Sequence, residues 1–309
     1  AAPPKAVAKP SLSEKVRRYN NLIKVIEIEK FVDDMSPSVR ILDLGCGRGQ
    51  DINKYSRKFR AVEITKYIGV DFAEAAVEEA RRRQHALHQR GENEYPAEFH
   101  SGDLRSDETF AKLQAGGHTC FDVVSIQFTL HYLASSEEAM RTFLKRIHGL
   151  LRPGGRVIAS IPNSDSLSNL YVRGLEEHGL DSGDGMKVGN RLYNVCFQGD
   201  VWKGLGADED ELDEAFGRKW GSPYDFTLVD AVEAQTEYII PWQAFSEMVE
   251  EIGFTVHMDG TFSELFESYS KQSKFFNGIF SKDPENAGPL SAEEQELFEF
   301  YSGFCLIRT

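Results

Sequence analysis

The sequence predicts an α/β protein built on one mostly parallel β-sheet with helices on both faces. Three observations support this fold class. Short apolar runs typical of buried strands recur along the chain, they alternate with stretches of helical periodicity, and a glycine-rich turn follows the first of them directly. Successive parallel strands need long crossover connections, which helices usually supply. We therefore expect a sheet whose strands are joined through helices.

The first half of the chain supplies most of this alternation. Apolar residues three to four apart, from Val16 to Phe31, predict a helix. The elements expected after it are strands at 39–44 and 67–70, a helix at 73–89, and strands at 98–101 and 121–127. A helix around 139–150 should stop at the Pro-Gly-Gly turn at 153–155, and a strand at 156–161 should end at Pro162.

The second half is expected to close the same sheet. Its predicted elements are strands at 224–228 and 234–240, a helix at 242–252, and strands at 254–259 and 298–307. Residues 163–222 are rich in Gly and Asp and look irregular, so we expect an irregular acidic insertion at about 174–222. The resulting organisation is a flexible N-terminal tail at 1–12 and a single domain at 13–309.

Composition limits the function classes. The 309 residues carry a net charge of −14, which argues against sequence-independent binding of nucleic acid through its phosphate backbone. No apolar run is long enough for a membrane span or a signal peptide. The four cysteines are scattered, and no His/Cys or carboxylate cluster stands at metal-ligand spacing. A reducing compartment is expected, and because the chain begins without Met we expect it to be part of a longer polypeptide.

The glycine-rich turn predicts a cofactor site. Gly45, Gly47 and Gly49 follow a strand and let the backbone approach a ligand closely. Their spacing lacks the third glycine of the dinucleotide fingerprint, and Asp43 just before the turn would repel a pyrophosphate but attract a cation. S-adenosylmethionine carries an ammonium and a sulfonium, and is therefore the expected cofactor.

Two further acids stand at strand ends. Asp71 ends the second strand, where a carboxylate accepts hydrogen bonds from ribose hydroxyls. Asp103 follows the third strand and is placed to accept from an adenine amine, with Phe72 and Leu104 flanking the ring. A single glycine turn is often only a tight turn, but four such features in this order favour a methyltransferase.

Four segments together resemble the eukaryotic mRNA cap guanine-N7 methyltransferases. They are the Asn-Asn-x-x-Lys helix at 20–24, the glycine motif at 42–51, the Gln-Phe-x-x-His-Tyr segment at 127–132, and Pro-Asn-Ser at 162–164. The match extends from about residue 16 to the end of the chain. It implies a Rossmann-like class I S-adenosylmethionine-dependent methyltransferase fold with a seven-stranded sheet.

The resemblance also implies the cofactor contacts. Asn20 and Lys24 share one helix face, and Lys24 would bind the methionine carboxylate, although an isolated lysine there would normally be a solvated surface residue. The full set of cofactor residues that the resemblance and the motifs imply is Lys24, Asp43, Gly45, Gly47, Asp51, Asp71, Asp103 and Gln127.

The resemblance also implies a set of residues that bind the cap guanine. His131 and Tyr132 would contact the base, although such a pair is more often packed in a core, and Pro162 would form part of the same wall. Glu237 matches the acid that accepts from guanine N1 and the exocyclic amine, which adenine cannot satisfy. Tyr301 matches a late tyrosine that lines the pocket. Asn20 is included among the substrate-binding residues.

Two arginines match basic positions used against the cap triphosphate. Arg48 stands where the family usually has lysine, which keeps the charge but changes its geometry. Arg83 lies in a run of three arginines that an exposed helix face would equally explain. The family's upstream aromatic segment lies before the start of this chain, and the insertion at 174–222 matches nothing that we can place.

The expected reaction is methyl transfer to N7 of the guanosine in GpppN-capped mRNA, giving m7GpppN-RNA and S-adenosylhomocysteine. Guanine N7 carries a free lone pair at neutral pH, so direct in-line displacement needs no acid or base catalyst and no metal. The expected partners are the capped 5′ end of mRNA and, further, a guanylyltransferase domain or other capping components and RNA polymerase II, with no membrane. The nucleus is the expected location, with the cytoplasm as the alternative.

Two alternatives stay open from the sequence. The first is a methyltransferase of a small metabolite, which would keep the glycine motif and Asp71 but would not need Glu237 or Lys24. The second is an inactive cap-binding or scaffold module that retains the fold. Methyl transfer to a capped dinucleotide would distinguish the cap guanine-N7 methyltransferase from both alternatives.

Overall fold

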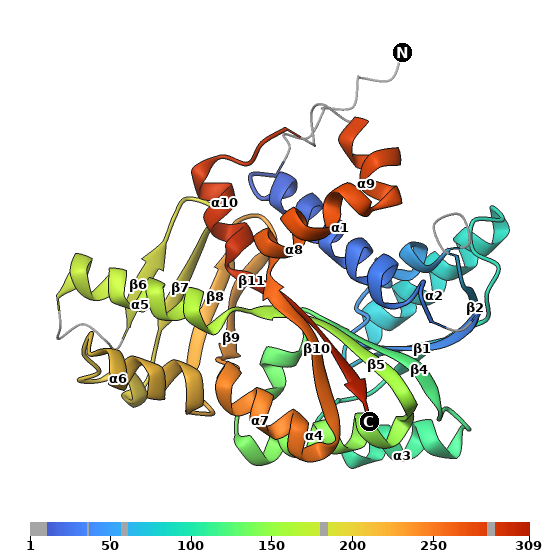
Figure 1. Cartoon of the computed structure of the whole chain (residues 1–309), viewed down its shortest axis with the longest axis horizontal. Coiled ribbons are helices and arrows are strands. Elements are labelled where there is room, and N and C mark those ends of the chain that lie inside the picture. Colours follow the sequence, from blue (N-terminus) through green and yellow to red (C-terminus); the bar gives the residue numbers. More distant parts are fainter. Residues whose placement is uncertain (1–10, 36, 57–60, 180–184, 283–287) are drawn as a thin grey trace.

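The main sheet of the protein has seven strands in the order β10-β11-β5-β4-β1-β2-β3 (Figure 1). The computed structural model describes residues 11–35, 37–56, 61–179, 185–282 and 288–309. Only β11 runs antiparallel to its neighbours β5 and β10, so the expectation of a mostly parallel seven-stranded sheet is confirmed. The strands are β1 (Ser38–Leu44), β2 (Glu63–Asp71), β3 (Ala97–Ser101), β4 (Phe121–Gln127), β5 (Leu151–Pro162), β10 (Phe254–Thr261) and β11 (Tyr301–Arg308).

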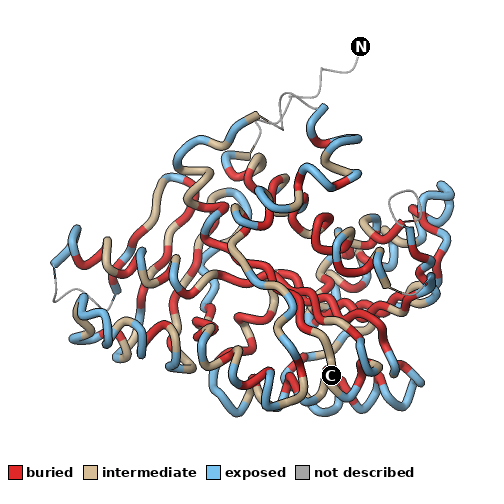
Figure 2. The backbone as a smooth tube through the Cα atoms, viewed as in Figure 1, coloured by how far each residue is buried: buried red, intermediate tan, exposed pale blue. Residues whose placement is uncertain are grey.

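Helices cover both faces of this sheet. One apolar cluster joins β1 and β2 to α1 (Glu14–Phe31) and α2 (Glu74–Gln89). A second cluster joins the opposite face to α3 (Asp107–Ala115), α4 (Glu137–Leu150) and α7 (Trp242–Ile252). Figure 2 shows the central strands as the most continuously buried part of the molecule. The apolar runs in these strands therefore reflect burial on two sides.

A second sheet of four antiparallel strands lies beside the first (Figure 1). Its strands are β6 (Met186–Gly189), β7 (Tyr193–Phe197), β8 (Pro223–Leu228) and β9 (Val232–Tyr238). The expectation that β8 and β9 would close the main sheet is therefore wrong. Strand β8 alternates buried and partly exposed residues, as expected for a sheet with one solvated face, whereas β4 in the main sheet is buried throughout.

The segment expected to be irregular contains regular elements. Residues 163–222 include α5 (Ser164–His178), β6, β7, η3 (Asp200–Trp202), α6 (Glu209–Leu212) and η4 (Asp213–Arg218). Trp202 is fully buried against Tyr171, Phe197 and Phe216, and its indole N–H donates to the Pro223 carbonyl. Large aromatic side chains supply the apolar area that organises this segment. Residues 180–184, within the expected insertion, and residues 1–10 of the expected tail lie outside the described residues.

The C-terminal part also differs in detail from the expectation. The last strand begins at Tyr301 because residues before it form α10 (Ala292–Glu299), which starts with a capping box between Ser291 and Glu294. Two more helices, α8 (Phe262–Tyr269) and α9 (Lys274–Gly278), precede it, and α8 and α10 pack with α1. Among the described helices, none is long and apolar enough to cross a membrane.

Candidate functional site

Two cavities meet at the carboxyl ends of β1, β2, β3 and β4, where ligands of open α/β sheets bind. The larger has a volume of about 530 Å³ and the smaller about 300 Å³. Phe128 and Tyr132 line both cavities and so form their shared wall. The larger is lined by Gly45, Asp71, Phe72, Asp103, Leu104, Arg105, Gln127, Phe128, Thr129, Tyr132, Leu133, Gln235, Thr236 and Tyr238.

The glycine turn after β1 forms one side of the larger cavity. Gly45 has φ +79°, and a Cβ there would lie 2.1 Å from Oγ1 of Thr129. Only glycine therefore fits between this backbone and the segment after β4. The Gly47 amide donates a 2.9 Å hydrogen bond to Asp71 Oδ2, which ties the turn to the end of β2.

Two carboxylates face the larger cavity from neighbouring strand ends. Asp71 accepts from the amides of Gly47 and Ala73 at 2.9 Å each, which fixes its orientation. Asp103 forms an ion pair with Arg105 at 3.0 Å, and hydrogen bonds from Arg105 hold the pKa of Asp103 below its usual range. Carboxylate oxygens are the acceptors that a ribose and an adenine amine require.

Phe72 stands out beside these acids because it is a large aromatic residue in an exposed position. Its exposed fraction is 78%, and it lines the larger cavity together with Leu104. A single exposed apolar residue is ordinary at a protein surface, but this one borders a cavity and is free to pack against a flat ligand. Phe72 and Leu104 are the two residues expected to flank an adenine ring.

Lys24 on α1 is held by two partners. Its Nζ lies 2.9 Å from Oδ2 of Asp51 and 4.9 Å from the centre of the Phe128 ring. Lys54 is the second cation on Asp51. Burial acts to raise the pKa of Asp51, but Lys24 and Lys54 outweigh it and hold that pKa well below its usual range. Lys24 reaches the smaller cavity, whereas Asp51 lies beneath it as a positioning acid.

Asp43 lies deeper than a direct ligand contact would suggest. It is buried, accepts a hydrogen bond from the Tyr67 hydroxyl, and lines neither cavity. Burial first, and then the nearby Asp51, raise the pKa of Asp43 to about 7. Its place is just before the glycine turn, where it bonds Tyr67 rather than lining a cavity.

Gln127 ends β4 and lines the larger cavity, but its side chain is already engaged. Nε2 donates to Glu27 Oε2 at 3.0 Å, and Oε1 accepts from the Ser160 hydroxyl at 2.5 Å. The amide therefore links α1 to β5 beneath the site. A cofactor would meet the backbone of Gln127 more readily than its side-chain amide.

The smaller cavity contains a buried carboxylate held by tyrosines. Glu237 on β9 has an exposed fraction of 4% and accepts from the Tyr132 hydroxyl at 3.1 Å and from the Tyr224 hydroxyl at 2.8 Å. His131 Nε2 lies 3.5 Å from Glu237 Oε1, while His131 Nδ1 is buried and has no hydrogen-bond partner in the part of the chain that the structure describes. The cavity lining is Arg17, Asn20, Asn21, Lys24, Gln50, Phe128, His131, Tyr132, Phe226, Leu228, Ala231, Val232, Glu237 and Tyr301.

Local backbone structure explains how His131 and Tyr132 reach this position. They lie on a 3-10 turn, η2 (Leu130–Leu133), directly after β4. Phe128 before it has φ +57°, a left-handed conformation that is unusual for an aromatic residue. The Phe128 ring packs edge-on against Tyr301 at 4.9 Å, so the strained residue is held by the last strand.

Several predicted site residues lie outside both cavities. Arg83 on α2 lies next to Arg48 in the glycine turn, and its Nε donates to the Arg48 carbonyl at 3.1 Å. Pro162 is buried at the end of β5, opposite Tyr301 in the sheet register. Gly47, Asp43 and Asp51 likewise support the cavities without lining them.

Some residues of the site were not singled out from the sequence. Tyr224 holds Glu237, Lys54 pairs with Asp51, Tyr67 bonds Asp43, and the shared wall includes Phe128. Tyr224 had one available signal, since a β8–β9 hairpin in this register places it directly opposite Glu237. The others depend on contacts between distant segments.

Known proteins resemble this chain in sequence over most of its length. The family model described as the mRNA (guanine-N(7))-methyltransferase domain matches residues 6–309. An mRNA cap guanine-N(7) methyltransferase of Schizosaccharomyces pombe is 30% identical over 94% of this chain and 74% of its own length. One of Meyerozyma guilliermondii is 32% identical over 94% of this chain, which spans about half (52%) of that relative.

A solved structure gives independent support for the fold. The CcbJ methyltransferase of Streptomyces caelestis superposes with a TM-score of 0.50 at 12% identity, covering 93% of this chain and 90% of that one. At that identity the likeness concerns the arrangement of the elements alone.

Proposed function

The chain belongs to the mRNA (guanine-N(7))-methyltransferase family, and on this premise we propose that it methylates N7 of the guanosine in GpppN-capped mRNA. S-adenosylmethionine supplies the activated methyl group, and the products are m7GpppN-RNA and S-adenosylhomocysteine. The observation that carries the proposal is the buried Glu237 carboxylate at the wall of a cavity that shares Phe128 and Tyr132 with the nucleotide-type cavity.

The larger cavity fits the cofactor. Asp71 would accept from the ribose hydroxyls and Asp103 from the adenine amine, with Phe72 and Leu104 against the ring. Gly45 leaves the backbone open to close approach. Lys24, which reaches the junction beside Phe128, would bind the methionine carboxylate while staying paired with Asp51.

The smaller cavity fits guanine. Each carboxylate oxygen of Glu237 has a second lone pair, so it could accept from guanine N1–H and the exocyclic amine while still bonded to Tyr132 and Tyr224. His131 Nδ1 has no hydrogen-bond partner among the described residues and could donate to the guanine carbonyl oxygen. Asn20 Oδ1 is a second buried atom without a partner at this cavity.

These residues orient the base and require no proton transfer. Guanine N7 is unprotonated at neutral pH, so Glu237, His131, Tyr132 and Tyr301 would act by positioning rather than as acids or bases. The exposed Arg48 and the partly buried Arg83 would contact the triphosphate where it leaves the cavity. We further propose the nucleus as the site of action and other capping components or RNA polymerase II as partners.

The direct test is transfer of labelled methyl from S-adenosylmethionine to GpppG-capped RNA, with uncapped RNA and free GTP as comparisons. The proposal expects label at guanine N7 of the capped RNA and none in uncapped RNA. A protein that binds the cofactor but labels no cap would instead be a small-metabolite methyltransferase or an inactive binding module.

A further inference from the structure

A cluster of two imidazoles and a carboxylate lies outside the two cavities. Glu98 and His100 belong to β3, and His118 lies between α3 and β4. Glu98 Oε2 lies 3.8 Å from His100 Nε2 and 3.5 Å from His118 Nε2, and the rings of the two histidines are 5.2 Å apart. The spacing of these residues along the sequence predicts no metal site, but folding brings one potential ligand atom from each of them within 4.8 Å of the others.

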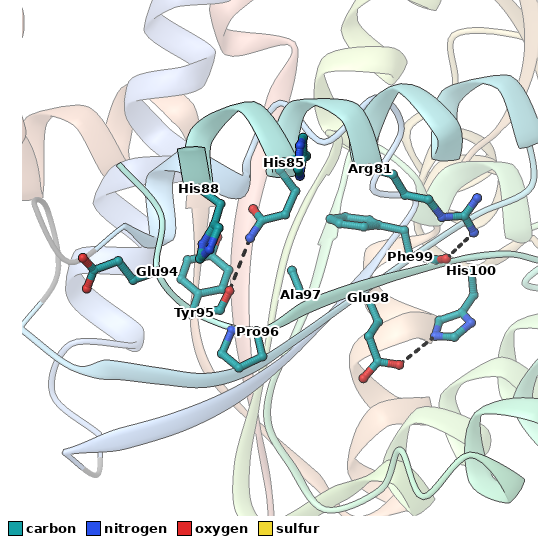
Figure 3. Close-up of a pocket in the computed structure, with 11 residues that line it drawn as sticks. Arg81, His85, His88, Glu94, Tyr95, Pro96, Ala97, Glu98, Phe99 and His100 are labelled. Carbon is teal, nitrogen blue, oxygen red and sulfur yellow. Dashed lines mark hydrogen bonds and ion pairs between the residues drawn. The ribbon is translucent and has the colours of Figure 1, made fainter. Parts of the chain in front are cut away.

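The backbone directs the three side chains to one place. Residues two apart on a strand share a face, so Glu98 and His100 project together. Figure 3 shows both on one side of β3, while Phe99 and Arg81 lie on the other side, toward α2. A Cβ at Gly116 would lie 3.0 Å from the His118 ring, so the glycine leaves room for that ring to turn toward the strand.

One ring nitrogen that faces Glu98 has no hydrogen-bond partner. This atom is His100 Nε2, which is buried and unpartnered among the described residues; His118 faces Glu98 through Nε2, and its exposed fraction is only 5%. Buried polar nitrogens without a partner are unfavourable. Glu98 is half-exposed, so the cluster stays accessible to an ion from solvent.

The distances suit a small tetrahedral ion. Zinc bonds to imidazole nitrogen and carboxylate oxygen measure about 2.0–2.2 Å, which places tetrahedral ligand atoms roughly 3.3–3.5 Å apart. The distance of 3.5 Å between Glu98 Oε2 and His118 Nε2 already falls in this tetrahedral range. The distance of 3.8 Å between Glu98 Oε2 and His100 Nε2 needs only a small side-chain adjustment. Two imidazoles with one carboxylate select zinc-like transition metals over calcium or magnesium.

We propose that Glu98, His100 and His118 bind one divalent transition-metal ion, with Zn²⁺ as the best match and water in the fourth position. The ion would join the edge strand β3 to the segment that leads into β4. Lys66 Nζ lies 3.4 Å from Glu98 Oε1, the carboxylate oxygen away from the histidines, and its charge would weaken the site without blocking it. The site is separate from the methyl-transfer cavities.

The test is a titration of the tag-free, full chain with ZnCl₂ by calorimetry at fixed pH, followed by Co²⁺ absorption spectra. We expect one ion per chain with a dissociation constant on the order of micromolar or tighter. Bound Zn²⁺ should raise the melting temperature, because it binds the folded state preferentially. Co²⁺ should show the visible bands of a four-coordinate site.

Variants identify the ligands. His100→Ala and Glu98→Gln alter accessible side chains and should weaken Zn²⁺ binding at least tenfold, and His118→Ala should do the same if it folds. His85→Ala on α2, on the opposite side of β3, is the matched control and should bind as the parent does. Lys66→Gln should bind severalfold more tightly because a competing charge is removed.

Two results would overturn the proposal. One is the absence of saturable Zn²⁺ binding below about 1 mM. The other is binding that His100→Ala and Glu98→Gln leave unchanged, which would place the ion elsewhere. In either case the cluster would be an ion-pair group only.

Discussion

Tyr224 and Glu237 face each other across the β8–β9 hairpin, where the tyrosine hydroxyl donates a 2.8 Å hydrogen bond to Oε2 of the carboxylate. Tyr224 is fully buried, so this bond is shielded from water. Tyr132 holds the other oxygen at 3.1 Å. Two hydroxyls thus fix the plane of the carboxylate that would bind the cap guanine: Tyr224 from the second sheet and Tyr132 from the turn after β4.

Tyr224→Phe should loosen the orientation of Glu237. We expect kcat/KM for capped RNA to fall about 5- to 10-fold, which corresponds to about 1 kcal/mol for one hydrogen bond to a charged group. Cofactor affinity should not change. Tyr193→Phe is a matched control, since Tyr193 is also buried and donates to a glutamate, Glu296, at 2.7 Å away from both cavities. Equal activity losses in the two variants would contradict a specific role for Tyr224.

Gly45→Ala should damage the cofactor turn through a steric contact. The added Cβ would lie 2.1 Å from Thr129 Oγ1, so the turn or the segment after β4 must move. We expect at least a tenfold loss of S-adenosylmethionine affinity by calorimetry. Gly91→Ala has a similar positive φ, +66°, but nothing within 4 Å of the new Cβ, and therefore controls for backbone strain alone. Cofactor affinity that is the same in both variants would refute the contact argument.

Phe72→Ala should weaken cofactor binding without destabilising the protein. The side chain is 78% exposed and therefore contributes little to the core, but it would cover one side of the adenine. Loss of about 1 kcal/mol of stacking corresponds to a roughly fivefold weaker affinity, with an unchanged melting temperature. Ile279→Ala removes another exposed apolar side chain, at the C-terminal end of α9 and outside both cavities, and should change neither quantity. An unaltered cofactor affinity in Phe72→Ala would place the adenine elsewhere.

Glu27 should make stability depend on pH. Its exposed fraction is 1%, and burial raises its pKa from 4.5 to about 8, although Gln127 and Lys24 act in the opposite direction. The unfolded chain therefore releases this proton at lower pH than the folded chain. The free energy of unfolding should fall as pH rises from about 4.5 to about 8, by at most about 1.4 kcal/mol per pH unit from this group.

Glu27→Gln tests this assignment because it keeps the shape but removes the titration. In denaturant melts from pH 5 to 8 the variant should lose less stability with rising pH than the parent. The exposed Glu138→Gln on α4 should follow the parent curve. Parallel curves for Glu27→Gln and the parent would show that Glu27 does not titrate in this window.

The sequence predicted best where local pattern decides structure. Buried parallel strands read as short apolar runs, so β4 was predicted with its exact ends and β1 within one residue. The acids at 71 and 103 were found because the ends of parallel strands meet at one edge. The resemblance to a known family supplied Glu237 and Tyr301, which no local pattern would have selected.

What the sequence missed depends on contacts between distant segments. Trp202 and its aromatic neighbours form the core beside the second sheet. The surrounding sequence is rich in Gly and Asp, so its pattern does not predict this core. Glu27 becomes a buried acid only because β4 brings Gln127 against α1. Nothing in the sequence indicates that the side chains of Asp43 and Gln127, two of the expected cofactor residues, bond Tyr67 and Glu27.

The most direct test of the account is whether Glu237 reads the guanine edge. We would measure kcat/KM for N7 methylation of GpppG-capped RNA and of the same RNA capped with inosine, which lacks the exocyclic amine, for the parent and Glu237→Gln. The account predicts at least a tenfold preference for guanine in the parent and little preference in the variant. A parent that does not distinguish the two caps, or a variant that keeps the full preference, would contradict it.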